Sequence, residues 1–361
     1  MKIGILSMQR VINYGSFWQA NLLKKLFESQ GHKVEFIDIV PGRRLYTYSQ
    51  NNKYSIGRMN RVLRKIKSVR LGKIISDFQK KILGCGSVPN YSYDYDCIII
   101  GSDEVFNFAQ PASWGFSPQL HGAINNENVS SYAASFGAST YEDIGKYGVR
   151  DELVNAFSNL KHISVRDENS YRIISKLLPN QKIYRHLDPV LIGDFPIYER
   201  KEVKKKYIII YAYSSRFNDE NYIKAIRQFA NKNKLKIYAV LGYQDWVDKN
   251  IVVDPFELLQ YFANAEYVIT DTFHGTIFSV RCHKKFVTVI REGQVGNRQK
   301  LSSLLEDLNL KNRHLTNESD IEKILTTEID YQVVDHILQN ERQRTEEYLK
   351  MCLNNAKETK R

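Results

Sequence analysis

The chain has 361 residues, of which 43% are hydrophobic, and it carries a formal net charge of +12. This length exceeds what one hydrophobic core usually serves, and the apolar content excludes a disordered chain, so we expect two globular domains. No stretch approaches about 18 consecutive apolar residues, which excludes a membrane-spanning helix. The N-terminus shows no signal-peptide pattern and the four cysteines share no metal-like spacing, so a reduced cytoplasmic compartment fits best.

The positive charge is concentrated in one segment. No acidic residue lies between Asp38 and Asp77, and ten of the twelve excess charges fall there. The cations of this segment are Arg43, Arg44, Lys53, Arg58, Arg61, Arg64, Lys65, Lys67, Arg70 and Lys73. Because the rest of the chain is nearly balanced, the basicity requires a local explanation.

Short apolar runs alternate with helical patterns along most of the chain. The predicted strands cover residues 2–7, 33–39, 96–101, 129–134, 162–166, 207–213, 235–241, 266–270 and 285–290. The predicted helices cover residues 16–30, 57–83, 150–160, 168–178, 219–233, 255–264, 275–283 and 298–308. This alternation is typical of α/β domains, in which helices cover both faces of a parallel sheet.

A charged connector, 199–206, separates two such sets of elements. We therefore expect a first Rossmann-like domain over 1–198 and a second over 199–330. A mostly polar helical pattern within 331–361 is expected to cross back onto the first domain. Two such domains facing a cleft give a GT-B-like architecture, and ligands of open α/β sheets bind where strands end.

Small polar residues follow the first predicted strand. Asn13-Tyr14-Gly15-Ser16 stands at a predicted helix start, where backbone N–H groups can meet an anion or a hydroxyl. The same residues also suit an ordinary turn with a capped helix. No G-x-G-x-x-G pattern occurs, so a dinucleotide site has no support.

Charged residues end two further strands of the first domain. Gly101-Ser102-Asp103-Glu104 places two carboxylates at a cleft edge, where one can act as a general base or Asp103 can simply cap a helix. Ser164-Val165-Arg166-Asp167 ends another strand, where Arg166 can hold a carboxylate or phosphate through two parallel hydrogen bonds. A surface ion pair of Arg166 with Asp167 or Glu168 is the alternative.

The sharpest pattern passes from the strand 266–270 directly into a helix, through Asp271-Thr272-Phe273-His274-Gly275-Thr276. His274 and Gly275 are predicted at the helix N-terminus, which favours an anion. Gly275 allows a ligand to approach closely and Thr276 offers a hydroxyl. Histidine titrates near neutrality, so His274 can move protons beside a phosphate. A lone histidine is usually structural, but one in this setting is a candidate acid–base group.

Together these segments resemble the polysaccharide pyruvyl transferase family over about 310 residues, up to Leu310. The matching segments are Asn13-Tyr14-Gly15 with Gln19, Gly101 to Asn107, Ser131 to Gly137, Ile163 to Asp167, Leu187 to Val190, Thr270 to Gly275, and Asn297-Arg298 before Leu304-Leu305. The resemblance implies a GT-B-like fold and transfer from phosphoenolpyruvate onto two sugar hydroxyls, giving a pyruvate ketal and phosphate. It implies a place in the biosynthesis of bacterial surface polysaccharides, such as capsule or exopolysaccharide.

The family's functional residues carry over onto three positions: its histidine before glycine matches His274, its strand-end arginine Arg166, and its acidic residue Asp103. Some members have an arginine two residues before the histidine, where this chain has Thr272. We expect Arg298 to supply the missing positive charge. Weaker candidates for the same role are Lys300, Arg291 and Arg281.

Phosphoenolpyruvate, the expected donor substrate, carries a carboxylate and a phosphate, so its pocket needs at least two cations and backbone donors. We expect Arg166 and Arg298 to bind these groups, assisted by the N–H groups of Gly275 and Thr276. His274 protonates the phosphate or the methylene carbon, and Asp103, in preference to Glu104, deprotonates a sugar hydroxyl. Other expected binding residues are Asn13, Tyr14, Gly15 and Thr272. This chemistry demands no cofactor and no metal.

The basic segment contains a predicted amphipathic helix within 57–83. Its apolar face comprises Met59, Val62, Leu63, Ile66, Val69, Ile74 and Phe78. We expect this face to pack on the core while the cations stay in solvent. The cations of 43–73 also suit anionic lipid head groups or the diphosphate of a lipid-linked acceptor, which would place the protein peripherally on the inner face of a membrane.

Two rival functions fit parts of the sequence. A GT-B glycosyltransferase using a nucleotide sugar has the same two-domain cleft, but the second domain shows no clear acidic residue to hold a ribose. A nucleic-acid-binding protein would use 43–73, since phosphates attract such a stretch. No nucleic-acid-binding motif accompanies it, so we expect no nucleic-acid partner.

Overall fold

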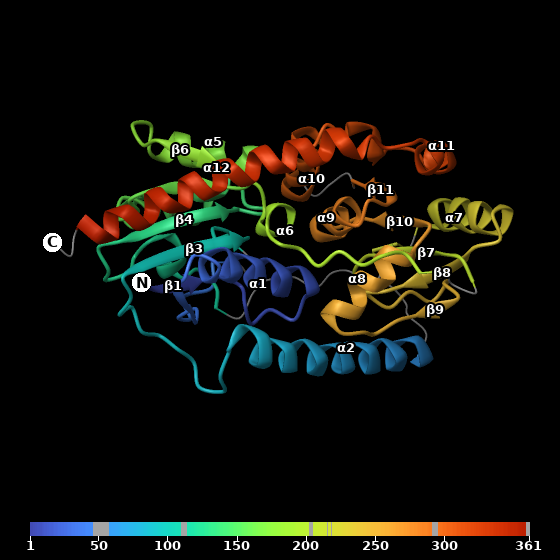
Figure 1. Ribbon diagram of the computed structural model, residues 1–361, viewed down its shortest axis with the longest axis horizontal. Helices are drawn as coiled ribbons and strands as arrows, with labels where there is room; N and C mark the ends of the chain where they lie inside the picture. Colours follow the sequence, from blue (N-terminus) through green and yellow to red (C-terminus); the bar gives the residue numbers. More distant parts are fainter. Residues whose placement is uncertain are drawn as a thin grey trace.

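The computed structural model describes residues 1–45, 58–109, 114–201, 205–214, 216–217, 219–290 and 295–358. Two six-stranded sheets dominate it, and the paired strands of each sheet run parallel. Figure 1 shows them side by side along the long axis, with helices packed around both. The two-domain α/β fold predicted from the sequence is therefore confirmed.

The first sheet has the order β2-β1-β3-β4-β5-β6. Its strands are β1 (Lys2–Leu6), β2 (Lys33–Ile37), β3 (Cys97–Asp103), β4 (Val129–Ala134), β5 (Ile163–Val165) and β6 (Ile183–Arg185). Its helices are α1 (Tyr14–Glu28), α2 (Arg58–Phe78), the π-helical turn η1 (Gln79–Leu83), the 3-10 turn η2 (Pro118–His121), α3 (Tyr141–Tyr147), α4 (Arg150–Phe157), α5 (Glu168–Leu177) and α6 (Pro189–Ile192). The central strands β3 and β4 are buried along their whole length, as expected of a sheet covered on both faces.

The second sheet has the order β12-β11-β10-β7-β8-β9. Its strands are β7 (Tyr207–Tyr211), β8 (Lys236–Ala239), β9 (Lys249–Asn250), β10 (Tyr267–Thr270), β11 (Lys285–Val289) and β12 (His314–Leu315). Its helices are α7 (Glu220–Lys232), α8 (Pro255–Asn264), α9 (Phe273–Arg281), α10 (Val295–Asp307), α11 (Ile321–Thr326), and the 3-10 turns η3 (Lys311–Arg313) and η4 (Glu318–Asp320). All nine predicted strands are present; β6, β9 and β12 were missed because two or three residues show no periodicity.

The last helix, α12 (Tyr331–Glu358), crosses from the second domain back to the first, as predicted. Near its start the Tyr331 hydroxyl donates to the carbonyl of Lys284 at 2.6 Å. Near its end the Tyr348 hydroxyl donates to the carbonyl of Ser131 on β4, also at 2.6 Å. Helix α12 therefore fastens both domains together along one edge of the molecule (Figure 1).

The two domains share one apolar core, in which α1 and α6 of the first domain pack on α8 and α9 of the second. Trp18 lies at the middle of this contact: its ring is 5.0 Å from that of Phe256, and its indole N–H donates to the carbonyl of Pro255. Phe195 and Phe278 stack beside it. Because this interface is apolar and fully packed, it fixes the side chains that the two domains direct toward each other.

Helix α2 runs along the opposite edge of the molecule and spans both domains (Figure 1). It packs through a stripe formed by Lys67, Leu71 and Ile75, each less than 9% exposed. The Lys67 ammonium reaches the second domain and donates to the carbonyls of Ala239 and Gly242 at 3.3 and 2.9 Å. Burial lowers the pKa of Lys67 to about 7.

The predicted burial of the apolar face of this helix is wrong for most of its members. Five of them are between 41% and 72% exposed: Met59, Val62, Leu63, Ile66 and Val69. Ile74 and Phe78 are partly buried. The reason is that α2 has two apolar stripes, and the domains cover only the one that contains Lys67, Leu71 and Ile75. No described helix is long and apolar enough to cross a membrane.

Candidate active site

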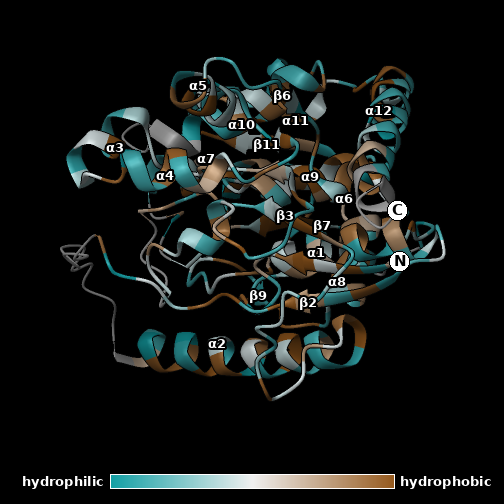
Figure 2. Cartoon of the chain, turned by 90° about the vertical axis from the view of Figure 1, so that its left-hand side faces the viewer, coloured by the Kyte–Doolittle hydropathy of each residue, from teal (hydrophilic) through white to brown (hydrophobic). Residues whose placement is uncertain are grey.

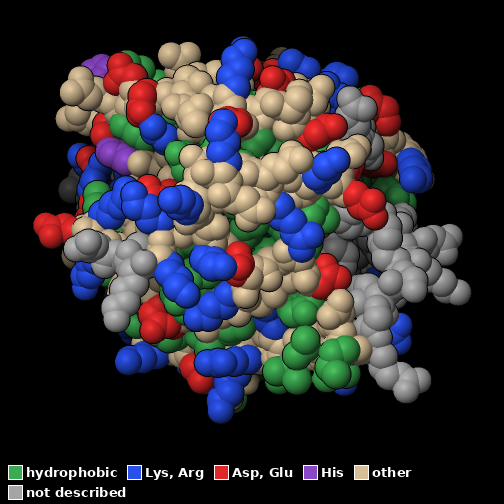
Figure 3. All heavy atoms as spheres, turned by 90° about the vertical axis from the view of Figure 1, so that its right-hand side faces the viewer, with side chains coloured by type: hydrophobic (Ala, Val, Ile, Leu, Met, Phe, Trp, Pro, Cys, Tyr) green, Lys and Arg blue, Asp and Glu red, His purple; other side chains and the backbone are tan. Residues whose placement is uncertain are grey.

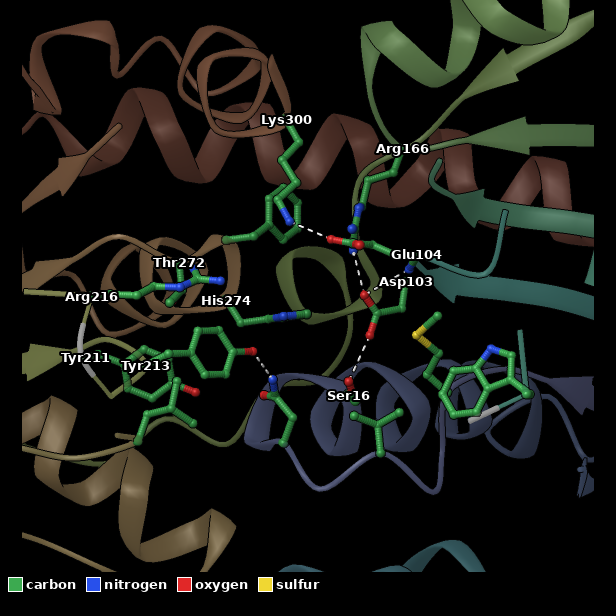
Figure 4. Close-up of a pocket in the computed structure, with 16 residues that line it drawn as sticks. Ser16, Asp103, Glu104, Arg166, Tyr211, Tyr213, Arg216, Thr272, His274 and Lys300 are labelled. Carbon is green, nitrogen blue, oxygen red and sulfur yellow. Dashed lines mark hydrogen bonds and ion pairs between the residues drawn. The ribbon is translucent and has the colours of Figure 1, made fainter. Parts of the chain in front are cut away.

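A cavity of about 420 Å³ opens where the carboxyl ends of both sheets face each other. Sixteen residues line it: Met8, Val11, Asn13, Ser16, Asp103, Glu104, Trp114, Arg166, Tyr211, Tyr213, Arg216, Leu241, Thr272, Phe273, His274 and Lys300. Figure 4 shows charged side chains entering from several elements, with His274 pointing toward Asp103. The predicted strand-end residues Asp103, Arg166 and His274 thus meet in one place, as the rule for open α/β sheets requires.

Asp103 ends β3 with a φ of 80°, in the left-handed region. One carboxylate oxygen accepts a hydrogen bond from the Ser16 hydroxyl at 2.9 Å, and the other accepts from the backbone N–H of Glu104 at 3.0 Å. The residue is 8% exposed and faces the cavity. Asp103 is therefore a fixed carboxylate with access to a ligand, which is the geometry that a general base needs.

Arg166 follows β5 and its side chain is only 2% exposed. Its Nη1 donates to the Asp188 carboxylate at 2.8 Å and lies 3.8 Å from an oxygen of Asp103. The guanidinium stacks 4.1 Å from the centre of the Phe273 ring, across the domain interface. Burial opposes its charge, but Asp188 and Asp103 raise its pKa above the ordinary value. Arg166 is thus a buried cation at the cavity and not a surface ion pair.

Asp188 caps α6 and is fully buried beneath the cavity. The oxygen that receives Arg166 also lies 3.6 Å from Nε2 of His274. Burial alone would raise the pKa of this carboxyl, but His274 and Arg166 lower it to about 2. Asp188 is therefore ionised at neutral pH, and its carboxylate lies beside the His274 ring. The sequence analysis quoted this residue within Leu187 to Val190 without giving it a role.

His274 is the second residue of α9 and directly follows Phe273, whose ring stacks on Arg166. Gly15 of α1 lies directly against its ring: a Cβ at position 15 would stand 2.2 Å from Nδ1. Within the described part of the chain, Nε2 of His274 is buried and has no hydrogen-bond partner. The same is true of Nε of Arg166 and the hydroxyl of Tyr211, which also line the cavity. Buried polar groups without partners point to an absent ligand.

Two cations from the second domain complete the cavity. Lys300 on α10 pairs with Glu104 at 2.5 Å, so this ion pair joins the two domains. Burial would raise the pKa of Glu104, but Lys300 and Arg166 lower it to about 2. Arg216 follows β7, stacks 4.6 Å from the Tyr213 ring and lies 3.8 Å from an oxygen of Asp271. Arg216 thus brings a guanidinium beside the position where Thr272 replaces an arginine.

The other predicted sources of the second positive charge lie elsewhere. Arg298 is exposed and does not line the cavity. Burial and the charge of Arg298 lower the pKa of His314 on β12. Arg281 donates to the carbonyl of Gly193 at 3.2 Å, at the far end of α9. The expectation that Arg298 lines the cleft is therefore wrong, and Arg291 lies outside the described residues.

The N–H groups of Gly275 and Thr276, at the start of α9, are hydrogen-bonded to Thr272 of the same segment. The Thr272 hydroxyl, at the N-cap, accepts from the N–H of Gly275 at 2.9 Å, and the Thr272 carbonyl accepts from the N–H of Thr276 at 3.1 Å. Thr276 is fully buried and its hydroxyl also bonds within the second domain. A Cβ at Gly275 would lie 2.1 Å from the Thr270 hydroxyl. Gly275 and Thr276 are thus packing residues, and their N–H groups do not face a ligand.

At the start of α1, Asn13 lines the cavity but its neighbour Tyr14 does not. Asn13 lines the cavity, caps α1 through the N–H of Gly15 at 2.7 Å, and donates to the Tyr213 hydroxyl across the interface. Tyr14 does not line the cavity and is 1% exposed; its hydroxyl donates to the carbonyl of Val253 at 2.7 Å. Tyr14 therefore joins the domains and does not face the cavity. In the described ranges, no group of three or more His, Cys, Asp or Glu is arranged to hold a metal ion.

A comparison with models of protein families matches residues 13–292 to the polysaccharide pyruvyl transferase family. The chain belongs to this family. The matched range covers the strands β2 to β11 and every residue of the cavity except Met8, Val11 and Lys300. A search of curated protein sequences finds no match.

Solved structures with a similar fold include nucleotide-sugar enzymes. The S. aureus MnaA–UDP co-structure has a TM-score of 0.51 at 13% identity, covering 98% of this chain and 96% of that chain. The UDP-GlcNAc 2-epimerase from Neisseria meningitidis bound to UDP-GlcNAc has a TM-score of 0.46 at 12% identity, covering 97% and 99%. The glycosyltransferase SnogD from Streptomyces nogalater has a TM-score of 0.43 at 11% identity, covering 98% and 99%. The similarity to the first of these structures, with its TM-score of 0.51, shows that this chain has a GT-B-like fold.

Replacing Asp188 by Asn should destabilise the protein and reduce turnover together. The change keeps the shape but leaves Arg166 and His274 without their nearest carboxylate, and breaking a buried ion pair costs about 3 kcal/mol or more. Urea unfolding and turnover measurements on Asp188→Asn test this. The control is Asp194→Asn, because the Asp194 side chain is 71% exposed in its pair with Arg342. Equal midpoints for both variants would contradict the role given to Asp188.

Gly15→Ala should displace the His274 ring, since the added methyl group has no room beside Nδ1. A displacement of about 1 Å at such a group lowers turnover by roughly 100-fold. The matched control is Gly145→Ala in α3, where nothing lies within 4 Å of the added methyl group and helix propensity favours alanine. Histidine ring NMR signals together with turnover report the effect; an unmoved His274 signal in the Gly15 variant would disprove the contact.

Proposed function

We propose that this member of the family transfers the enolpyruvyl group of phosphoenolpyruvate onto two hydroxyls of a sugar and releases phosphate. The observation that carries this proposal is the cavity itself, which gathers Arg166, Arg216, Lys300 and His274 around buried donors that lack partners. Phosphoenolpyruvate presents a carboxylate and a phosphate, and several cations in a partly dry pocket suit such a small, doubly anionic donor.

The donor is expected to lie between the two groups of cations. Arg166 binds one anionic end from the first domain, with its free Nε as the extra donor. Arg216 and Lys300 bind the other end from the second domain, and Lys300 is held in place by Glu104. Tyr211 supports the same side with its unpaired hydroxyl. This arrangement assigns the role of the arginine absent at Thr272 to residues from two other elements.

His274 supplies the first proton. From its position beside Asp188, it protonates the methylene carbon C3 of the donor, which becomes a methyl group. Cationic character develops at C2, and a sugar hydroxyl attacks there while Asp103 accepts its proton. The C2–O bond to phosphate then breaks and phosphate leaves with the bonding pair and the proton held by Asp103. The second sugar hydroxyl bonds to C2, and its proton restores His274.

The acceptor approaches from the first domain, because Asp103 and the Ser16 hydroxyl that holds it lie on that side. We further propose that this acceptor is a sugar linked through a diphosphate to a lipid, within the biosynthesis of a surface polysaccharide such as a capsule. The family to which the chain belongs supports the polysaccharide part of this proposal. The lipid part rests on the basic character of α2 and its surroundings.

A nucleotide-sugar glycosyltransferase is the alternative that the fold permits. Such an enzyme usually needs an acidic residue near the ribose hydroxyls in its donor domain. Among the described residues, the second domain lines the cavity with Tyr211, Tyr213, Arg216, Leu241, Thr272, Phe273, His274 and Lys300. None of these is acidic, so the donor side of the cavity is better suited to a small anion than to a nucleoside.

His274→Ala should lower turnover with phosphoenolpyruvate by roughly 10²–10⁴-fold, the range for a positioned acid–base group. The measurement is transfer of label to a sugar acceptor from a panel of radiolabelled donors, phosphoenolpyruvate against nucleotide sugars. His336→Ala, an exposed histidine on α12, is the matched control and should keep full turnover. Transfer from a nucleotide sugar but not from phosphoenolpyruvate would replace the proposed function by its alternative.

Arg216→Ala and Lys300→Ala should each raise KM for phosphoenolpyruvate by about 10- to 100-fold, because one charge-assisted contact to the donor contributes about 1.5–3 kcal/mol. Arg298→Ala removes the same kind of charge from an exposed site outside the cavity and should leave KM unchanged. Steady-state kinetics over a range of donor concentrations distinguish these variants. A raised KM for Arg298→Ala with normal values for the other two would restore the prediction made from the sequence.

A further inference from the structure

Helix α2 presents an apolar stripe to solvent. Met59, Val62, Ile66 and Val69 recur every three or four residues and are 72%, 50%, 58% and 65% exposed. Leu63, 41% exposed, widens the stripe. Figure 3 shows hydrophobic side chains gathered along the lower edge of the molecule, where α2 lies, and Figure 2 shows hydrophobic and hydrophilic residues alternating along the helix. A continuous exposed apolar stripe on one helix is uncommon unless it meets a partner.

Cations surround this stripe. Six exposed lysines and arginines lie on α2 and the turn η1 that follows it: Arg61, Lys65, Arg70, Lys73, Lys80 and Lys81. No ion pair within the described part of the chain involves any of these six. From residue 58 to residue 83 the only acidic residue is Asp77. The exposed side of α2 is therefore both apolar and strongly cationic.

Two hydrogen bonds join α2 and η1 to segments that line the active-site cavity. Gln79 of η1 donates to the carbonyl of Val11 at 2.9 Å, and Lys67 donates to the carbonyl of Gly242 at 2.9 Å. Val11 and Leu241, the neighbour of Gly242, both line the active-site cavity. A surface bound to the outer side of α2 would therefore lie one helix away from segments that line the cavity.

We propose that α2 docks the protein on an anionic membrane surface, with the stripe Met59, Val62, Ile66 and Val69 among the lipid head groups and the cations around it on anionic phosphates. A helix with an apolar stripe and a cationic surround is suited to lie in the plane of a membrane interface. This proposal rests on the proposed function, since it brings the cavity to a lipid-linked acceptor. Nucleic acid would pair with the cations but leave the apolar stripe in water.

Sedimentation of the full-length chain with vesicles tests the proposal. Vesicles of phosphatidylglycerol and phosphatidylethanolamine should bind the chain at low salt and release much of it at high salt, while vesicles of phosphatidylcholine should not bind it. The stripe variant (Val62→Ser, Ile66→Ser and Val69→Ser) should weaken binding about tenfold or more. The charge variant (Arg61→Gln, Lys65→Gln and Arg70→Gln) should weaken it about 100-fold at low salt.

The control variant combines Ile197→Ser with Val333→Ser, two comparably exposed apolar residues on other segments, and should bind as the unaltered chain does. Circular dichroism checks that the variants fold. If the stripe variant does not fold, the charge variant alone tests whether α2 binds the vesicles. Turnover with a water-soluble acceptor should be unchanged in both folded α2 variants, whereas turnover with a lipid-linked acceptor in vesicles should fall.

Failure of the unaltered chain to bind anionic vesicles at low salt would overturn the proposal. So would equal binding by the unaltered chain and the two α2 variants. If sedimentation velocity shows a dimer that the stripe variant abolishes, while vesicles bind nothing, a second copy covers the stripe and the membrane proposal is wrong. Vesicle binding needs neither donor nor acceptor, so a failure of docking is distinguishable from a failure of phosphoenolpyruvate as the donor.

Discussion

The buried carboxylate of Asp188 is the interaction on which the site depends. A guanidinium as deeply buried as that of Arg166 is unstable without a paired anion, and Asp188 supplies that anion at 2.8 Å. The same oxygen faces His274 from the second domain, at 3.6 Å. One carboxylate therefore holds Arg166 of the first domain and lies beside His274 of the second. Its position is fixed in turn by the N–H of Val190, which donates to its other oxygen.

The domain interface performs the positioning that a closing movement provides in other two-domain enzymes. The Trp18 and Phe256 rings, the Phe195 and Phe278 stack and the Lys300–Glu104 pair all cross it. Such packing leaves little freedom for the domains to separate, because an apolar contact that opened would expose its side chains to water. Asp103 and His274 are thus held opposite each other by the same contacts that stabilise the fold.

Much of the fold could be predicted because buried parallel strands are long apolar runs, as in Cys97–Ile98–Ile99–Ile100. The rule that ligands bind at strand ends then brought Asp103, Arg166 and His274 together correctly. The same rule, applied to the end of β7, would also have found Arg216. Asp188 could not be found this way, because its role depends on burial between two domains that a sequence does not reveal.

Lys300 and Arg298 show that a sequence does not reveal which side of a helix faces the cleft. Two residues apart on a helix, their side chains point about 200° apart, so only one of them can face the cleft. Which one does so depends on how α10 is rotated against the first domain, and its contact with α5 sets that rotation. A helical pattern locates the helix but not this angle, so the second cation was assigned to the wrong residue.

The same uncertainty, which side of a helix faces the protein, applies to helix α2. Its apolar residues form two stripes, and periodicity alone does not decide which one the protein covers. The domains cover the stripe that carries a cation, Lys67, because the carbonyls of Ala239 and Gly242 satisfy the ammonium there. That choice leaves the purely apolar stripe in solvent, among unpaired cations and beside the entrance to the cavity. An exposed apolar stripe of this kind is uncommon on a surface without a partner, which is why we assign it to a membrane surface.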